Sequence, residues 1–365
     1  MKKIAALVPN KLGKSPGQRF RIEAWSKHLP DYGWTVDFYP FETEELDKVL
    51  YTKGNYLKKV SGLISSYRGQ LRNVWNKPEC DILLIYREAA LVGPAVIERL
   101  AKRLKVPIVY DIDDPVFLPY RSPVNSWFSL LKFSRKTHSF FRMADHIISI
   151  NNLMADYARK YNSSVSVVPN FVDTNEFCPA GSKNGGPAKI VWTGSIGTVR
   201  NLATIAKPLH DLQAKYDVPL RLIANEEPVV EGVKVDFRKW SPDVEISNLQ
   251  DCDIGLVPLL DLRWNPWKFF LKTVQYMAAG LPVVARRMGS NTEIIQDGVN
   301  GFLVETEKEW FDRLSLLIEN RELREKMGRA ARKTAVEGYS LETQMPKIAE
   351  IFDGVYEGTL RNKKR

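Results

Sequence analysis

Three polar side chains interrupt an otherwise apolar stretch in the second half of the chain, residues 267–280. Lys268, Lys272 and Gln275 stand there at i, i+4 and i+7, which in a helix places them on one face. Two ammonium groups and an amide on a mostly buried helix suit a phosphate attached to a hydroxyl-rich group. The alternative is that both lysines extend to solvent from a half-buried helix.

A small-residue turn forms a second candidate site. Gly194, Ser195 and Gly197 follow a short apolar run and, with Arg200, precede a helix predicted over residues 202–216. Glycines permit close backbone approach, the amides at a helix N-terminus favour an anion, and an arginine can bind phosphate with two hydrogen bonds. Many turns of this composition are purely structural, so this alternative stays open.

These residues need elements to position them, and the chain alternates short apolar runs with helical patterns. Such alternation predicts parallel sheets built from strand–helix–strand units. The predicted strands are residues 4–8, 35–39, 81–86, 106–110, 146–150 and 165–169, then 189–192, 220–224, 254–258 and 282–285. We therefore expect an α/β protein with two doubly wound domains, whose strand ends face a cleft that would bind ligands. The predicted boundaries are 1–175 for the first domain, 176–187 for a linker, 188–340 for the second domain and 341–358 for a terminal helix returning to the first.

Composition narrows the function classes. The 365 residues are 44% hydrophobic and 26% charged, as in a globular protein, and the formal net charge of +10 suggests an anionic partner. The three cysteines are far apart in the sequence, which favours a reducing compartment. The first apolar run is short and ends at a proline, so it is interpreted as a strand and not as a signal peptide. No apolar run reaches the roughly 20 residues that span a bilayer. The expected location is cytoplasmic, peripheral on a membrane at most.

Several segments resemble one family. Residues 272–304, KTVQYMAAGLPVVARRMGSNTEIIQDGVNGFLV, resemble the donor-binding core of the large retaining glycosyltransferase family with the GT-B fold, which includes mannosyl- and glucosyltransferases of bacterial surface polysaccharides. Residues 190–202, DCDIGLVPL at 251–259, SPGQRFR at 15–21, YDIDD at 110–114 and VVPNFVDTNEF at 167–177 are similar to further segments of it. The resemblance implies two Rossmann-like domains, the first binding a glycan or lipid-linked acceptor and the second a nucleotide-diphosphate sugar.

The resemblance also implies roles for individual residues. Arg200 and Lys272 would stabilise the leaving diphosphate, which takes the acceptor proton during front-face transfer with retention of anomeric configuration. The expected donor-binding residues are Gly13, Gly194, Ser195, Pro258, Leu259, Lys268 and Gln275. The expected acceptor-binding residues are Arg19, Asp113, Asp114 and His138; a cluster of aspartates capping a turn is the alternative for the aspartates. The family's paired glutamates correspond here to Trp267 and Gln275, a departure that bears on donor identity and rate. No metal and no cofactor are expected, because cations replace the metal and the nucleotide sugar is a co-substrate.

Two basic segments predict contact with an anionic membrane surface. Residues 51–77 and 120–143 contain lysines and arginines, among them Lys58, Lys59, Arg135 and Lys136, without any acid, and the second also carries aromatic residues. The alternative is a solvated basic face over core aromatics. Three other functions compete with the enzyme: a degenerate sugar-nucleotide-binding protein, a nucleic-acid-binding protein supported by charge alone, and an epimerase. No recognised nucleic-acid module is present, so no nucleic-acid partner is expected.

Overall fold

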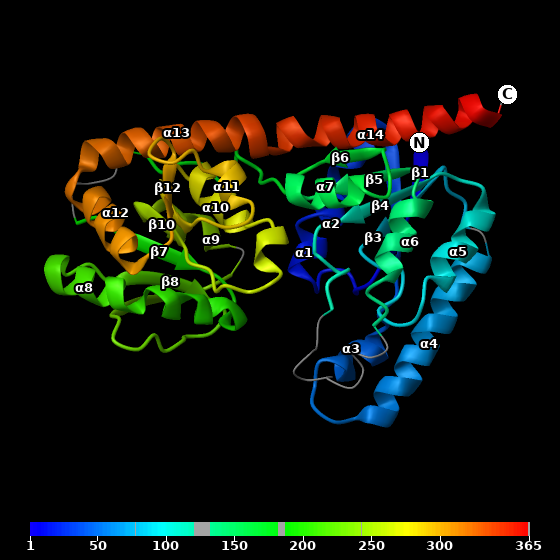
Figure 1. The fold of residues 1–365 in the computed structure, drawn as a ribbon, viewed down its shortest axis with the longest axis horizontal. Helices are drawn as coiled ribbons and strands as arrows, with labels where there is room; N and C mark the ends of the chain where they lie inside the picture. Colours follow the sequence, from blue (N-terminus) through cyan, green and yellow to red (C-terminus); the bar gives the residue numbers. More distant parts are fainter. Residues whose placement is uncertain (77, 120–131, 182–186, 242, 364–365) are drawn as a thin grey trace. The chain divides into compact units, whose positions relative to one another are not determined.

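The computed structural model describes residues 1–76, 78–119, 132–181, 187–241 and 243–363, which form two α/β units. The first comprises Met1–Asn170 with Met345–Arg365, and the second is Phe171–Gln344 (Figure 1). The division therefore falls five residues before the predicted boundary at 175. The terminal helix α14, Leu341–Lys363, starts in the second unit and ends in the first, where Asp353 binds Lys2 and the Trp34 indole.

The first unit contains a parallel sheet with the strand order β2-β1-β3-β4-β5-β6. Its strands are β1 Lys2–Val8, β2 Trp34–Pro40, β3 Ile82–Tyr86, β4 Ile108–Ile112, β5 His146–Ser149 and β6 Val165–Val167. Its helices are α1 Pro16–Arg19, α2 Ile22–His28, η1 Leu29–Tyr32, α3 Glu44–Leu50, α4 Tyr56–Trp75, α5 Val96–Ala101, η2 Lys102–Leu104, α6 Lys136–Met143 and α7 Asn152–Arg159. Strand β1 has β2 on one side and β3 on the other, so the strand order reverses at β1. The switch point, where ligands usually bind, therefore lies at the carboxyl ends of β1 and β3.

The second unit also contains a six-stranded parallel sheet, but its strand order differs: β12-β11-β10-β7-β8-β9. Its strands are β7 Ile190–Thr193, β8 Leu220–Ala224, β9 Val235–Lys239, β10 Ile254–Val257, β11 Val283–Arg286 and β12 Gly301–Val304. Its helices are η4 Ile196–Ile205, α8 Ala206–Tyr216, α9 Glu245–Gln250, η5 Asn265–Trp267, α10 Leu271–Ala278, α11 Asn291–Ile294, α12 Glu307–Glu319 and α13 Arg321–Tyr339. The switch point lies between β7 and β10.

Two hydrophobic clusters cover the faces of the second sheet. One face packs on α9, α10 and α13, through residues such as Leu249, Met277 and Ala331, and the other packs on α8 and α12, through Leu209 and Leu314. Buried strands with helices on both faces read as continuous apolar runs. This explains why β9, a half-exposed edge strand, escaped prediction; β12 was missed although it is buried.

One expected helix is shorter than its sequence pattern suggested. The helix predicted over residues 268–279 is observed as α10, which begins at Leu271, and Lys268 has extended backbone after η5. The Ser290 hydroxyl accepts a hydrogen bond from the Phe270 amide at 2.8 Å, and the Ser290 amide donates to the Lys268 carbonyl at 3.3 Å. These bonds hold the segment out of the helix, so the predicted stripe of Lys268, Lys272 and Gln275 on one helix face is wrong.

A buried tyrosine joins α10 to the sheet. The Tyr276 hydroxyl accepts a hydrogen bond from the Thr193 amide, the last of β7, at 2.8 Å. The Tyr276 ring lies against Gly255 of β10 so closely that a Cβ atom there would stand 2.5 Å from two ring carbons. Gly255 is thus required by the space that the ring occupies.

We predict that Gly255→Ala destabilises the second unit by about 1–3 kcal/mol, since overpacking forces the tyrosine ring to move. Urea denaturation measures the change in free energy of unfolding. Gly338→Ala in α13 is the control, because a Cβ atom there has no neighbour within 4 Å. An unfolding midpoint of Gly255→Ala equal to that of wild type would contradict the prediction.

Candidate functional site

Lys272 has no ion-pair partner among the described residues of the second unit. Its ammonium lies 4.3 Å from the centre of the Trp192 ring, and a Cβ atom at Gly194 would overlap it. Among the described residues, no carboxylate pairs with Lys272. Burial lowers the pKa of Lys272 to about 7, so charged and neutral forms coexist near neutral pH. An incoming anion would find a half-buried cation at the sheet's switch point.

The turn after β7 presents backbone donors next to this lysine. The Gly194 amide donates to the Ile223 carbonyl at 3.0 Å, and the Ile196 amide donates to Asn225 Oδ1 at 3.1 Å, which fixes the start of η4. Within the described chain, the amides of Ser195 and Gly197 donate to no protein acceptor. The first amides of a helix attract anions, so this turn and Lys272 together form a candidate anion-binding site.

The other predicted donor-site residues divide into exposed and buried groups. Arg200 is exposed on η4, and its guanidinium makes no hydrogen bond or ion pair with the described residues. Pro258 and Leu259 are buried, and the Leu259 carbonyl accepts from Arg286 at 3.1 Å, so their side chains pack inside the unit. Lys268 is half-buried beside Trp267, outside α10.

Gln275 has a specific partner. Its side chain is 4% exposed, and its amide nitrogen donates to Glu245 Oε1 at 3.3 Å. Glu245 is the first residue of α9 and is half-buried. Sequence reasoning missed this carboxylate, because 30 residues separate it from Gln275.

Gly13, the donor-site residue expected in the first unit, already binds an anion of the protein itself. Its amide donates to both carboxylate oxygens of Glu23, at 3.0 and 3.2 Å. Gln18 supports the same carboxylate at 2.8 Å. The amide of Gly13 is therefore engaged, unlike the amides of Ser195 and Gly197 in the second unit.

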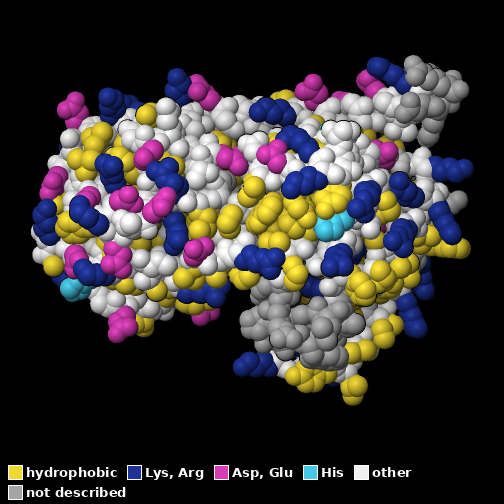
Figure 2. Space-filling model, viewed as in Figure 1, with side chains coloured by type: hydrophobic (Ala, Val, Ile, Leu, Met, Phe, Trp, Pro, Cys, Tyr) yellow, Lys and Arg dark blue, Asp and Glu magenta, His cyan; other side chains and the backbone are white. Residues whose placement is uncertain are grey.

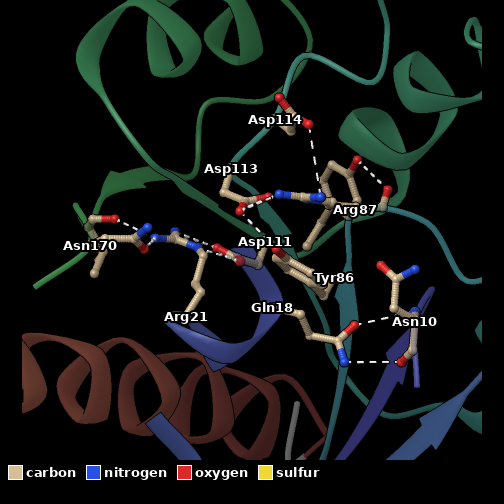
Figure 3. A network of polar contacts seen from close by, with 11 residues as sticks. Asn10, Gln18, Arg21, Tyr86, Arg87, Asp111, Asp113, Asp114 and Asn170 are labelled. Atoms are coloured by element: carbon tan, nitrogen blue, oxygen red, sulfur yellow. Dashed lines mark hydrogen bonds and ion pairs between the residues drawn. The ribbon is translucent and has the colours of Figure 1, made fainter. Parts of the chain in front are cut away.

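A buried ion pair organises the carboxyl edge of the first sheet (Figure 3). The Arg21 guanidinium donates two hydrogen bonds of 2.6 Å to the Asp111 carboxylate, and both side chains are fully buried. Arg21 also donates to the Val168 carbonyl and to Asn170 Oδ1, at 3.0 and 3.2 Å. A single arginine thus ties the segment after β1 to the ends of β4 and β6.

Asp113 lies beside this pair and has partners of its own. Arg87 binds both of its carboxylate oxygens, and the Tyr86 hydroxyl donates to it at 2.7 Å (Figure 3). Burial alone would raise the pKa of Asp113, but the Arg87 guanidinium outweighs burial and lowers it. Arg87 has φ of +55°, uncommon for a residue with a side chain, and its amide and carbonyl bind Asp111 and Tyr110. Asp113 is therefore held by Arg87 and Tyr86.

The remaining predicted acceptor residues lie in the same unit. Asp114 is half-buried and lies 3.9 Å from the Arg87 guanidinium, while the Arg19 guanidinium covers the Phe20 ring. His138 bonds to the Tyr157 hydroxyl at 2.8 Å and stacks on the Tyr161 ring. Burial and then the charges of Arg142 and Arg135 lower the pKa of His138, so the imidazole is neutral near pH 7. Sequence reasoning missed Arg87, although it directly follows a predicted strand.

Neither metal sites nor membrane spans are evident in the described residues. No group of three or more His, Cys, Asp or Glu side chains there could hold a metal ion. In the same part of the chain, no helix has the length and apolar content needed to cross a bilayer.

Family models match both halves of the chain. Residues 17–176 match the model described as Glycosyltransferase Family 4, and residues 187–320 match Glycosyl transferases group 1. The chain is 33% identical to spore coat protein SA of Bacillus subtilis over 98 residues, which cover 26% of this chain and 25% of that protein. It is 26% identical to sulfoquinovosyl transferase SQD2 of Arabidopsis thaliana over 283 residues, 68% of this chain and 52% of that protein. The chain thus spans between a quarter and about half of these relatives.

Solved structures share the fold. HepE of Anabaena in complex with UDP-glucose superposes with a TM-score of 0.68 at 17% identity, covering 97% of this chain and all of that one. At this identity the likeness concerns the fold. It confirms the expected class of two Rossmann-like domains with parallel sheets.

We predict that Arg21→Met lowers the free energy of unfolding of the first unit by about 3–5 kcal/mol, because it leaves the Asp111 carboxylate buried without its cation. Chemical denaturation measures this loss. Arg159→Met, which breaks the exposed pair with Asp156, is the control and should cost about 1 kcal/mol or less. Equal effects of the two substitutions would show that the buried pair is not a structural centre.

Proposed function

We propose that this chain, which matches the Glycosyltransferase Family 4 model over residues 17–176 and the Glycosyl transferases group 1 model over residues 187–320, transfers a hexose from a nucleoside-diphosphate sugar to an acceptor hydroxyl with retention of configuration. The acceptor is a glycan or a lipid-linked saccharide of a cell-surface polysaccharide or glycolipid. The UDP-glucose bound to the similar HepE structure supports a nucleotide-sugar donor.

The observation that carries the proposal is the un-neutralised Lys272 beside Gly194. The diphosphate would bind between this ammonium and the amides of Ser195 and Gly197, at the N-terminus of η4. Arg200, exposed on the same helix, would close on the diphosphate from solvent. These cations favour departure of the diphosphate by stabilising the charge that develops on it. No metal is needed for this role.

The acceptor would bind the carboxyl edge of the first sheet. Arg19, Asp114 and His138 are partly accessible there, and Asp113 is held by Arg87 and Tyr86. We assign Asp113 to positioning Arg87, because both carboxylate oxygens already accept hydrogen bonds. The acceptor hydroxyl would pass its proton to the leaving diphosphate, so no protein base is required.

Calorimetry with UDP, GDP, ADP and TDP and their common sugar conjugates tests the function, followed by turnover on lipid-linked and free glycans with NMR assignment of the product anomer. Donor binding without turnover on any acceptor would favour the degenerate binding protein. Salt-sensitive DNA binding without any nucleotide binding would favour the nucleic-acid protein.

Lys272→Ala is predicted to weaken nucleoside-diphosphate binding at least about tenfold, since a hydrogen bond to a charged group contributes about 1.5–3 kcal/mol. Isothermal calorimetry measures the loss. Lys326→Ala, which removes an exposed lysine of α13, serves as control and should leave the affinity unchanged. An unaltered affinity for Lys272→Ala would remove this lysine from the site.

The affinity should also depend on pH. The free protein has a Lys272 pKa of about 7, and a bound diphosphate raises that pKa, so binding above pH 7 takes up a proton. Affinity is therefore complete below the free-protein pKa and falls as pH rises above it, by up to about tenfold per pH unit. The diphosphate is fully ionised there, as its last pKa is about 6. Lys272→Arg keeps its charge and should flatten the profile; a flat wild-type profile between about pH 6 and 9 would contradict the prediction.

We further propose that the protein works in the cytoplasm and lies against an anionic membrane through α4. Exposed apolar residues and arginines follow one face of this helix: Leu57, Val60, Ile64, Arg68, Arg72 and Trp75. Leu57 is 87% exposed and Trp75 66% exposed, and no acid occurs in residues 51–77. Apolar and basic groups on one face are typical of interfacial helices. In Figure 2, apolar and basic side chains lie together along the described surface around this helix.

The structure corrects which basic residues can face the membrane. Lys59 is fully buried and donates to the Thr52 carbonyl, and Lys136 is 6% exposed and pairs with Glu88 at 2.8 Å. Lys58 and Arg135 are exposed as expected. Residues 77 and 120–131, which carry several of the predicted basic and aromatic groups, lie outside the described residues.

Reversal of Lys58, Arg68 and Arg72 to glutamate is predicted to release the protein from vesicles containing phosphatidylserine. Each basic residue near such a surface contributes about 1 kcal/mol, so the triple change weakens binding at least about a hundredfold. Co-sedimentation measures it. The matched control reverses Lys326, Arg329 and Lys333 of α13, with the same change in charge; equal release by both variants would indicate a net-charge effect and exclude α4 as the contact.

A further inference from the structure

The contact between Gln275 and Glu245 places a carboxylate near the cationic turn. Lys272 and Gln275 are three residues apart on α10, so their side chains leave neighbouring positions on one helix face. Gln275 is buried, and its amide donates to Glu245 at 3.3 Å. One turn of α10 therefore separates Lys272, which we propose binds the diphosphate, from Gln275, which contacts the acidic group.

The backbone holds this acidic group at the carboxyl edge of the sheet. The Glu245 amide donates to the Ser241 carbonyl at 3.1 Å, and the Trp240 amide donates to the Ala224 carbonyl, the end of β8, at 2.8 Å. Gly194 follows the neighbouring parallel strand β7, so the turn and Glu245 lie at the same edge. Glu245 is half-buried, whereas an acid with a merely solvating role would extend into water.

The chemistry of a nucleoside diphosphate matches this arrangement. Its ribose is joined to the first phosphate through a single methylene and carries two adjacent hydroxyls. A carboxylate accepts hydrogen bonds from both hydroxyls of such a pair, which an amide cannot do with equal strength. Dinucleotide-binding sheets use an acidic side chain near the phosphate turn for the same purpose.

We propose that Glu245 accepts hydrogen bonds from the donor's ribose hydroxyls and that Gln275 positions it by donating to its carboxylate. The proposal rests on the proposed function, because it assumes that the diphosphate binds at Lys272. Glu245 then makes the site selective for ribonucleotides, and α9, not α10, provides the negative charge.

Calorimetry with UDP, GDP and ADP, each beside its 2′,3′-dideoxy analogue, tests this role in the full chain. Wild type should bind the best ribonucleotide at least about tenfold more tightly than its dideoxy analogue. Glu245→Ala should bind the two forms within about threefold of each other, through loss of affinity for the ribonucleotide alone. Glu245→Gln, which preserves the shape, should reduce the preference as well. A Glu245→Ala or Glu245→Gln protein that keeps the wild-type preference would overturn the proposal.

Two further variants separate the possible failures. Lys272→Ala should weaken both forms equally and keep their ratio, whereas wild type that binds no nucleotide at all would refute the proposed function itself. The exchange Glu245→Gln with Gln275→Glu returns a carboxylate to the same place from α10 and should restore the ribose preference. If both Glu245 variants lose the preference and the exchange does not restore it, Glu245 acts only through folding of α9 and the proposal fails.

Discussion

The hydrogen bond from the Thr193 amide to the Tyr276 hydroxyl is the contact on which the candidate site depends. It fixes the end of β7 to the middle of α10, on a side chain that is fully buried. The ring can reach β7 only because β10 has glycine at position 255. Because the end of β7 is held on α10, the next residue of the chain, Gly194, lies against the side chain of Lys272, one turn before Tyr276 on the helix. A glycine is required again there, since a Cβ atom would overlap the ammonium.

Lys272 differs from other cations of the protein, including Arg221 of the same unit, which is buried and pairs with Asp236 and Asp251. In the first unit, buried or half-buried cations at the sheet edge have carboxylate partners: Arg21 with Asp111, Arg87 with Asp113 and Lys136 with Glu88. Removing two charges from water is costly, and such pairing recovers part of the cost within the protein. In the described part of the second unit, Lys272 lacks such a partner, and burial alone determines its lowered pKa. A desolvated charge without a counter-charge is characteristic of a site that receives one from a ligand.

The Gly13 and Gly194 turns illustrate the same contrast in backbone groups. Each follows the first strand of its sheet and precedes a short helical segment. In the first unit the Glu23 carboxylate binds the Gly13 amide, so an internal anion takes the place that a phosphate would need. In the second unit the Gly194 amide donates to the Ile223 carbonyl, whereas the Ser195 and Gly197 amides, close to Lys272, donate to no protein acceptor among the described residues. The two turns follow corresponding strands, but the side chains around them give their backbone amides different electrostatic roles.

The sequence by itself determined the architecture, and it predicted which residues along the chain form the candidate site. Repeated apolar runs between helical patterns predicted two parallel sheets, because strands covered on both faces must be apolar along their whole length. Gly194, Gly197 and Lys272 were recognisable from the sequence because their residue types and spacing are local features of the chain. Only the tertiary structure decided that Ser290 holds Lys268 out of α10, that Lys59 and Lys136 turn inward, and that Glu245 meets Gln275. Periodicity along one element reports which face is buried, whereas partners distant in sequence meet only when the elements pack.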